Sequence, residues 1–193
     1  MKLDRKQILT IPNMLSLLRL LMIPAIAAFY LHGHETWAAA MLILSGITNV
    51  ADGFIARKLG QISDLGKALD PVADKLTQAV MLLCLVSDHP LMILPFILLA
   101  IKELFAAISG LVVIKRTGVV LGAEWHGKLT TAMLYGMMIL HLIWQEIPLW
   151  VSNAFTISCI AMMLLSLCLY ARRNVQAIRD ADRKRKVSAS QEE

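Results

Sequence analysis

The chain has 193 residues, of which 58% are hydrophobic and only 17% are charged, and its formal net charge is +5. Soluble domains average about 45–50% apolar and about 25% charged residues, so this composition excludes an ordinary soluble domain. It also excludes a disordered chain. We expect no nucleic-acid partner, because the positions of the basic residues explain their excess better as a membrane orientation signal.

Six apolar runs follow one another along the chain, separated by short polar breaks. They cover about residues 12–31, 36–56, 68–87, 90–114, 127–145 and 148–171. The stretch from Ile147 to Ala171 holds 25 consecutive residues without Asp, Glu, Lys or Arg, which is long enough to cross a bilayer with some tilt. The pattern predicts an all-α integral membrane fold with six transmembrane helices.

The 19 Lys and Arg residues are distributed unequally between the two ends of this predicted bundle. The breaks after the first, third and fifth runs contain none of them, and sixteen lie at the opposite end or in the tail. The positive-inside rule therefore predicts that both termini are cytoplasmic. We expect a multi-pass cell membrane protein with a six-helix membrane domain over residues 1–171 and a basic cytoplasmic tail over residues 172–193.

Charged residues lie near the cytoplasmic ends of the second and third runs, and a charged pair splits the fourth run. They include Asp52, Asp70, Asp74 and the pair Lys102-Glu103. A charge inside a bilayer costs about 2.5–3.5 kcal/mol on insertion scales unless it is paired or hydrated. Several carboxylates at one depth therefore predict a polar cavity that faces the cytoplasm, where a cation relieves their repulsion.

The carboxylates fall on two helix faces, because residues three and four positions apart are neighbours on a helix surface. The two sets are Asn49, Asp52 and Ala56, and Gly66, Asp70 and Asp74. Their helices are consecutive and antiparallel, so the two faces can meet near the connecting loop. Three carboxylates and one carboxamide are hard oxygen ligands, which suit Mg²⁺, Mn²⁺ or Ca²⁺.

This spacing resembles the signature of the CDP-alcohol phosphatidyltransferases, D-x2-D-G-x2-A-R-x8-G-x3-D-x3-D. Seven of its eight fixed positions match, and the first is Asn49 instead of Asp. The segment from Ile11 to Arg19 resembles the short amphipathic N-terminal start of the family's phosphatidylglycerophosphate and cardiolipin synthases. Residues 127–131 resemble the lysine-threonine segment before their fifth span, so the resemblance covers about residues 8–170.

The resemblance implies metal-dependent transfer of a phosphatidyl group from CDP-diacylglycerol to an alcohol acceptor, with release of CMP. It implies that two Mg²⁺ or Mn²⁺ ions bind between the second and third helices, and that the chain is a homodimer. Asp74 would be the catalytic general base. The metal ligands would be Asp52, Asp70, Asp74 and Asn49, and the CDP-lipid pocket would include Gly53, Ala56, Arg57, Gly66 and Lys67.

Asn49 is the departure from the family pattern. An amide oxygen can bind Mg²⁺, but it brings no charge and bridges two cations poorly. Three interpretations stay open: an active enzyme with a weakened second metal site, an introduced substitution, or a non-catalytic relative that binds CDP-lipid.

The acceptor follows less directly from the sequence. Glycerol-phosphate-using members commonly have an arginine before the glutamate of the fourth span, where this chain has Lys102. A lysine cannot clamp a phosphate through two parallel hydrogen bonds, but several basic residues together can still bind it. The candidate acceptor residues are Lys102, Lys115, Arg116 and Lys128. Glycerol 3-phosphate is the first choice of acceptor and phosphatidylglycerol, giving cardiolipin, is the alternative.

The start of the third predicted helix has two interpretations. The Asp70-Pro71 pair would suit a helix start, but the resemblance requires a helix that begins earlier, at Ser63 or Asp64, with Pro71 inside it.

A channel or transporter that uses the acidic residues as an ion site is the competing class. It is disfavoured because no inverted repeat is visible and the acids lie near one end of the spans.

Overall fold

A computed structural model describes residues 11–59, 64–119, 121–122 and 124–189, with side chains described within 13–49, 69–119, 121–122 and 124–183. Over these ranges the chain forms α-helices and one short 3-10 helix, and contains no strand. The elements are α2 (Ile11–Leu31), α3 (Glu35–Leu59), α4 (Asp64–Leu85), η1 (Pro90–Met92), α5 (Ile93–Thr117), α6 (Trp125–Ile143) and α7 (Leu149–Ala189). The six apolar runs correspond to these six α-helices, so the all-helical prediction is confirmed.

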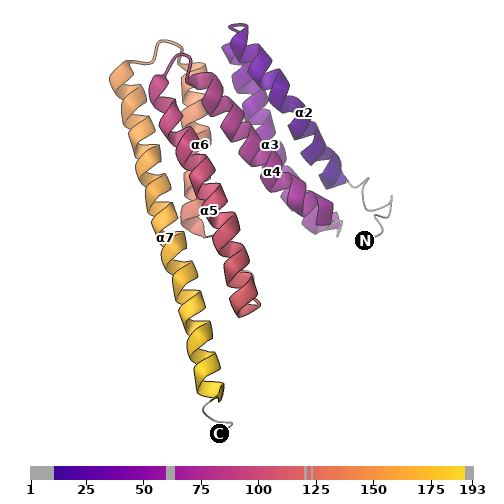
Figure 1. Cartoon of the computed structure of the whole chain (residues 1–193). Coiled ribbons are helices and arrows are strands. Elements are labelled where there is room, and N and C mark those ends of the chain that lie inside the picture. Colours follow the sequence, from indigo (N-terminus) through magenta and orange to yellow (C-terminus); the bar gives the residue numbers. More distant parts are fainter. Residues whose placement is uncertain (1–10, 60–63, 120, 123, 190–193) are drawn as a thin grey trace.

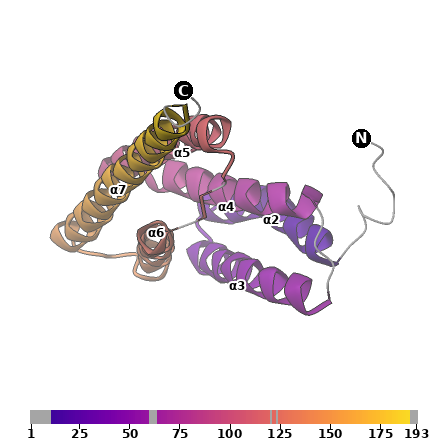
Figure 2. The ribbon, with the colours of Figure 1, turned by 90° about the horizontal axis from the view of Figure 1, so that it is seen from below.

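Consecutive helices run in opposite directions and form an up-and-down bundle (Figure 1). Short turns at the top of this view join α2 to α3, α4 to α5 and α6 to α7. Helix α2 packs against α3 and α4, while α7 packs against α5 and α6. Seen from below, α3 and α6 lie side by side across from α4 (Figure 2), and they also contact each other. Residues of α3 to α7 also line a cavity within the bundle.

Three helices are long and apolar enough to cross a membrane, judged by length and composition. The stretches are Asn13–Leu31, Pro90–Thr117 and Leu149–Arg183. Many large apolar side chains on the outer faces are exposed, among them Leu21, Leu111 and Ile157. Extensive exposed apolar surface is typical of a surface that contacts lipid or another protein. These features support a membrane protein, and the count of six spans stays a prediction.

The apolar core lies toward the end of the bundle that carries the short turns. Its buried residues include Leu42 of α3, Leu82 of α4, Met137 and Met138 of α6, and Met163 of α7. Some buried polar residues, among them Arg19 and His126, lie closer to the opposite end, whereas His141 and Ser152 lie beside the α6–α7 turn. The core thus fixes the relative positions of α2, α3, α4 and α6 where their polar residues face one another.

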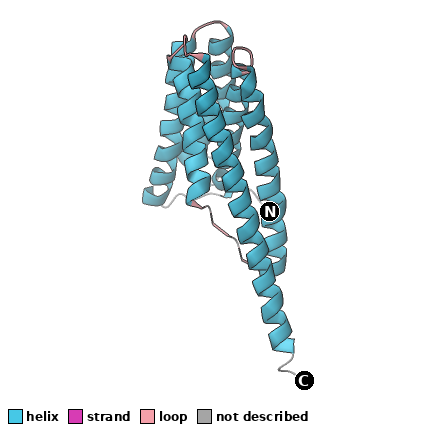
Figure 3. Ribbon diagram, turned by 90° about the vertical axis from the view of Figure 1, so that its left-hand side faces the viewer, coloured by secondary structure: helices cyan, strands magenta, loops and turns pink. Residues whose placement is uncertain are grey.

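Two helix boundaries bear on the sequence predictions. Helix α4 begins at Asp64 and contains Pro71, so the earlier of the two expected starts is confirmed. Helix α7 continues through residues 171 and 172 to Ala189 without a break, and its C-terminal part extends beyond the rest of the bundle (Figure 3). The division between membrane domain and tail therefore falls within one helix and stays a prediction.

Helix α6 approaches α7 closely at Gly127. A methyl group added to this glycine would collide with the hydroxyl of Tyr170 and lie 3.3 Å from its ring carbons. At Gly136, on the same helix, an added methyl group would meet no atom within 4 Å. The two glycines form a matched pair for testing how tightly α6 and α7 pack.

We predict that Gly127→Ala lowers the free energy of unfolding by about 1–3 kcal/mol, because the added carbon overpacks the contact with Tyr170. Gly136→Ala should leave the thermal unfolding midpoint in detergent unchanged or raise it, since alanine favours a helix more than glycine does. Adding Tyr170→Phe to Gly127→Ala should recover part of the loss. Equal midpoints for the two alanine variants would contradict the close packing.

Candidate active site

A buried arginine joins the first three helices. Arg19 of α2 is 1% exposed, and its Nη1 donates a hydrogen bond to Oδ1 of Asn49 on α3 at 2.8 Å. Its Nη2 donates to Oδ1 of Asp70 on α4 at 2.9 Å. Ser16, one turn earlier on α2, also donates to that oxygen of Asp70. The polar face of α2 thus meets both halves of the sequence motif.

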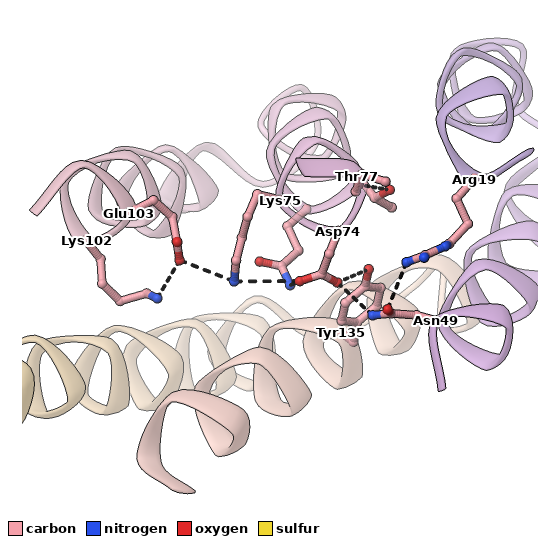
Figure 4. A network of polar contacts seen from close by, with 10 residues as sticks. Arg19, Asn49, Asp74, Lys75, Thr77, Lys102, Glu103 and Tyr135 are labelled. Atoms are coloured by element: carbon pink, nitrogen blue, oxygen red, sulfur yellow. Dashed lines mark hydrogen bonds and ion pairs between the residues drawn. The ribbon is translucent and has the colours of Figure 1, made fainter. Parts of the chain in front are cut away.

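Asp74 lies at the centre of this network (Figure 4). Its Oδ1 accepts a hydrogen bond from the hydroxyl of Tyr135 on α6 at 2.9 Å and lies 3.4 Å from Nδ2 of Asn49. Its Oδ2 lies 3.3 Å from Nε2 of Gln78 and 3.6 Å from Nζ of Lys75. Donors from α3, α4 and α6 therefore hold one carboxylate in a fixed orientation.

The network continues to α5 through two lysines. Nζ of Lys75 lies 3.2 Å from Oε1 of Glu103, and Nζ of Lys102 lies 2.6 Å from the same oxygen. Lys102 is 6% exposed. A buried charge without a partner is costly, so Glu103 stabilises both lysines within the bundle.

A cavity of about 1230 Å³ lies against this network and is lined by residues of α3 to α7. Asn49, Lys75 and Tyr135 belong to both the network and the cavity wall. Among the described residues, the charged ones in its lining are Lys75, Lys102, Glu103, Lys128 and Arg173. With four positive charges and one negative charge, the cavity suits an anionic ligand.

Contacts between α7 and the α5–α6 connection lie beside the cavity. Nη1 of Arg173 donates hydrogen bonds to the carbonyl oxygen of Gly122 and to Oε1 of Glu124, each at 2.8 Å. Its guanidinium carbon lies 5.1 Å from the centre of the Tyr170 ring. Asn174 donates to Ser109 of α5 at 2.8 Å. These contacts hold α7 against the cavity.

The structure brings together only part of the predicted site. Asn49, Asp70 and Asp74 share one network, and Lys102 and Lys128 line the cavity. Lys115 and Arg116 are exposed at the end of α5, outside the cavity lining, and Arg116 lies 4.0 Å from Asp182. The remaining predicted residues lie outside the described side chains, and their contacts stay predictions: Asp52, Gly53, Ala56, Arg57, Gly66 and Lys67.

Several residues of the site were not predicted from the sequence. Tyr135 had no part in the motif, and Arg173 was assigned to the basic tail. Helical spacing offered a signal for the latter, because Tyr170, Arg173 and Asn174 are three and four residues apart on a helix that continues past the last apolar run.

The described side chains contain part of the oxygen-donor set implied for the metal ions. Among the described side chains, no group of three or more His, Cys, Asp or Glu residues is arranged to hold a metal ion. Asp70 and Asp74 supply hard oxygens of the kind that Mg²⁺ and Mn²⁺ prefer. Arg19, however, already contacts Asn49 and Asp70. Asp70 and Asp74 are therefore the described carboxylates of the predicted ligand set, and the predicted ligand Asp52 lies outside the described side chains.

The contact of Glu124 with Arg173 predicts a pH-dependent contribution to stability. The hydrogen bond from Arg173 holds the pKa of the Glu124 carboxyl below its usual value. A carboxyl whose pKa is lowered by folding adds stability above its unfolded pKa, about 4.3, and this stability is lost as the pH falls through the folded value.

We therefore predict that Glu124→Gln lowers the thermal unfolding midpoint at pH 7, and that its difference from the unmodified chain shrinks as the pH falls below about 4. The control is Glu146→Gln, in the exposed α6–α7 connection, which should differ little from the unmodified chain at either pH. A Glu124→Gln difference that is the same at both pH values would contradict the pairing.

Comparison with known proteins gives the family. A sequence model of the CDP-alcohol phosphatidyltransferases matches residues 9–175. A Mycobacterium tuberculosis protein named as a probable phosphatidylglycerophosphate synthase is 35% identical over 149 residues, which is 72% of this chain and 69% of that protein. A CDP-diacylglycerol–glycerol-3-phosphate 3-phosphatidyltransferase of Cereibacter sphaeroides is 38% identical over 110 residues, 53% of this chain and 48% of that protein.

A second Mycobacterium tuberculosis protein, which carries a provisional cardiolipin synthase name, is 48% identical over 75 residues, 38% of this chain and 36% of that protein. The alignment thus spans just over a third of the length of that relative. The family model, in contrast, covers α2 to α6 completely and α7 as far as Val175. Together with the motif on α3 and α4, this match shows that the chain belongs to the CDP-alcohol phosphatidyltransferase family.

Proposed function

We propose that this protein transfers the phosphatidyl group of CDP-diacylglycerol to glycerol 3-phosphate, releasing CMP and forming phosphatidylglycerophosphate. The observation that carries the proposal is that the Asp74 network opens onto a large cavity with a positively charged lining. Both substrates carry phosphate, so both are attracted to the same cavity. The chain's relatives named for glycerol-3-phosphate transfer support this choice of acceptor.

The cavity also has an apolar wall. Ile43 and Ile47 of α3 and Val113 and Ile114 of α5 belong to its lining. A lipid donor must keep its acyl chains in an apolar environment while its diphosphate reaches polar groups. A cavity that combines apolar helix faces with lysines and an arginine satisfies both requirements.

Asp74 is the proposed general base. The acceptor hydroxyl forms a new bond to the phosphorus that carries diacylglycerol, the bond from that phosphorus to the CMP oxygen breaks, and the hydroxyl proton passes to the Asp74 carboxylate. Tyr135 and Gln78 orient this carboxylate by hydrogen bonds at 2.9 and 3.3 Å. A positioned base contributes about 10²–10⁴-fold to the rate.

Asp52, Asp70 and Asp74 would hold Mg²⁺ or Mn²⁺. When bound, such an ion offsets the negative charge of the diphosphate and of the departing CMP. Lys75, within 3.6 Å of Asp74, supplies positive charge on the cavity side. Lys102, Lys128 and Arg173 are placed to bind the acceptor phosphate at the other lining helices.

Phosphatidylglycerol is the second candidate acceptor, and cardiolipin would then be the product. Two observations favour it: the apolar part of the cavity wall, and a relative in Schizosaccharomyces pombe named as a cardiolipin synthase fusion protein, 41% identical over 81 residues, 42% of this chain and 14% of that protein. A chain that binds CDP-lipid without turnover is the remaining outcome, motivated by Asn49.

The purified protein in mixed micelles should release CMP from CDP-diacylglycerol with Mg²⁺ or Mn²⁺ when glycerol 3-phosphate is supplied, and much more slowly with phosphatidylglycerol. Asp74→Asn should lower this rate by about 10²-fold or more, because the base is lost, while CDP-diacylglycerol binding persists. Asp88→Asn, which alters a carboxylate in the turn after α4 that accepts a hydrogen bond from Tyr30, is the control and should retain the rate.

Faster turnover with phosphatidylglycerol would show that the proposed acceptor is wrong, while the proposed type of reaction would stand. Metal-dependent donor binding without CMP release from either acceptor would make the chain a binding protein. Asp74→Asn turnover near that of the unmodified chain would remove Asp74 as the base.

We further propose that all six helices cross the cell membrane, with both termini and the active site on the cytoplasmic side. The six α-helices of the described residues and the concentration of Lys and Arg at one end of the bundle support this orientation. Single cysteines in a cysteine-free background test it. Ser188→Cys should react with an impermeant maleimide only after the membrane is opened, whereas His34→Cys and Glu146→Cys should react in intact cells. The reverse pattern would invert the topology.

A further inference from the structure

A second, smaller cavity lies between α4 and α5, with a volume of about 460 Å³. Its described lining is apolar except for Lys75 and Glu103, and includes Val72, Leu76 and Ala79 of α4 and Phe96, Ala100 and Ala107 of α5. Four of these residues are exposed: Val72, Leu76, Ala100 and Ala107. This α4–α5 groove therefore opens on the outer surface of the bundle, which faces lipid in the proposed membrane orientation.

The two charged residues of the groove also line the large cavity. Nζ of Lys75 lies 3.2 Å from Oε1 of Glu103 and 3.6 Å from Oδ2 of Asp74 (Figure 4). The methylene groups of a lysine can lie along an apolar surface while its ammonium group reaches polar partners. Lys75 and Glu103 therefore form the boundary between the two cavities, and Lys75 connects this boundary to the proposed base.

Lys75 can give up its contact with Glu103 without leaving that carboxylate unpaired. Glu103 also contacts Lys102, whose Nζ lies closer, at 2.6 Å. The side chain of Lys75 is 29% exposed, against 8% for that of Lys102. An incoming phosphate can therefore bind Lys75 while Lys102 keeps Glu103 paired, which avoids the cost of an unpaired buried charge.

The length of the groove matches the depth of one leaflet. An α-helix rises by about 12 Å over the eight steps from Pro71 to Ala79, and half of a bilayer's hydrocarbon core is about 15 Å thick. These residues fall in the first half of the third apolar run, about residues 68–87, which is the cytoplasmic half in the proposed orientation. Helix α5 runs in the opposite direction (Figure 1), so Phe96 lies toward the membrane centre and Ala107 toward the cytoplasm. Lys75 lies between these ends, and the groove beyond it is apolar.

We propose that the α4–α5 groove holds one acyl chain of the CDP-diacylglycerol donor. The phosphate that carries diacylglycerol lies at Lys75, and the chain runs past Leu76 and Ala79, against Phe96 and Ala100, toward the membrane centre. The apolar wall of the large cavity then receives the second chain, because Lys75 borders both cavities.

The inference rests on the proposed function for the identity of the lipid. A second copy of this chain is the competing occupant of the groove. The lipid is favoured because the groove has a cation next to Asp74 and apolar residues beyond it, which is the arrangement that the phosphate and chain of a lipid require.

The test is photolabelling of the full chain in mixed micelles by CDP-diacylglycerol that carries a diazirine midway along each acyl chain, with Mg²⁺ and without acceptor. Mass spectrometry locates the labelled residues. We expect label on the groove residues of α4 and α5, and on α3 near Ile43 and Ile47, which line the large cavity. Excess unlabelled CDP-diacylglycerol should remove both labels. Phosphatidylcholine with the same chains should label the groove several-fold less, because it lacks the second phosphate and the cytidine.

Ala100→Trp fills the groove and should abolish its label, while the label near Ile43 and Ile47 persists and shows that the variant is folded and binds the donor. Ala161→Trp is the matched control and should keep both labels. It makes the same change at an exposed position of α7 outside the described lining of both cavities. If Ala100→Trp does not fold, the competition in the unmodified chain decides alone.

Absence of label from the groove would overturn the inference, and so would equal labelling by phosphatidylcholine or a groove label that persists in folded Ala100→Trp. A disulfide between two chains through Ala100→Cys, in a cysteine-free background, would assign the groove to a second copy and also overturn it. Glycerol 3-phosphate is then added to the same samples. CMP release without groove label would leave the proposed function standing, whereas competed groove label without CMP release would remove the function and keep the location of the acyl chain.

Discussion

Charges buried within a helical bundle have to be neutralised by other side chains of the bundle, and this requirement organises the interior of the protein. An unpaired buried charge is strongly destabilising. Arg19 pairs with Asp70, and Glu103 pairs with both Lys75 and Lys102. Arg19 with Asp70 joins α2 to α4, and Lys75 with Glu103 joins α4 to α5. Hydrogen bonds of the same network reach Asn49 on α3 and Tyr135 on α6. The polar network therefore orients α2, α3, α4, α5 and α6 relative to one another, in a region where apolar packing alone would be less specific.

The motif carboxylates and the basic residues of the cavity come mainly from two different groups of helices. The carboxylates of the motif lie on α3 and α4, and α2 contributes the arginine that contacts them. Lys102 and Lys128 enter the cavity from α5 and α6, and Arg173 enters it from α7. On the proposed function, the donor diphosphate and the reacting groups belong to the first half of the chain, and the acceptor phosphate belongs to the second. Relatives with different acceptors can then keep one motif and vary the later helices.

Apolar runs predicted the helices well, because a segment of about 20 apolar residues has one stable form in a bilayer. The motif spacing also predicted that α4 begins before Asp70, against the local preference of proline for a helix start. The roles of single polar residues within apolar runs are harder to predict from the sequence. The contacts of Arg19 with Asn49 and of Tyr135 with Asp74 cross the bundle, so the roles of these two residues depend on other helices. Tertiary contacts of this kind leave no local pattern.

Lys115 and Arg116, predicted with Lys102 as acceptor residues, lie outside the described cavity lining, and their role stays a prediction. They were grouped with Lys102 because they are basic and follow it on the same helix, but they lie three to four turns further along α5 and are exposed. Arg173, by contrast, reaches the cavity because α7 continues as a helix and Tyr170, Glu124 and Gly122 hold its guanidinium in place. A basic residue contributes to a buried anion site only when helix register and a second contact direct it inward. The number of positive charges nearby in the sequence therefore predicts poorly which basic residues line the cavity. A position on the helix face that carries other site residues predicts this better.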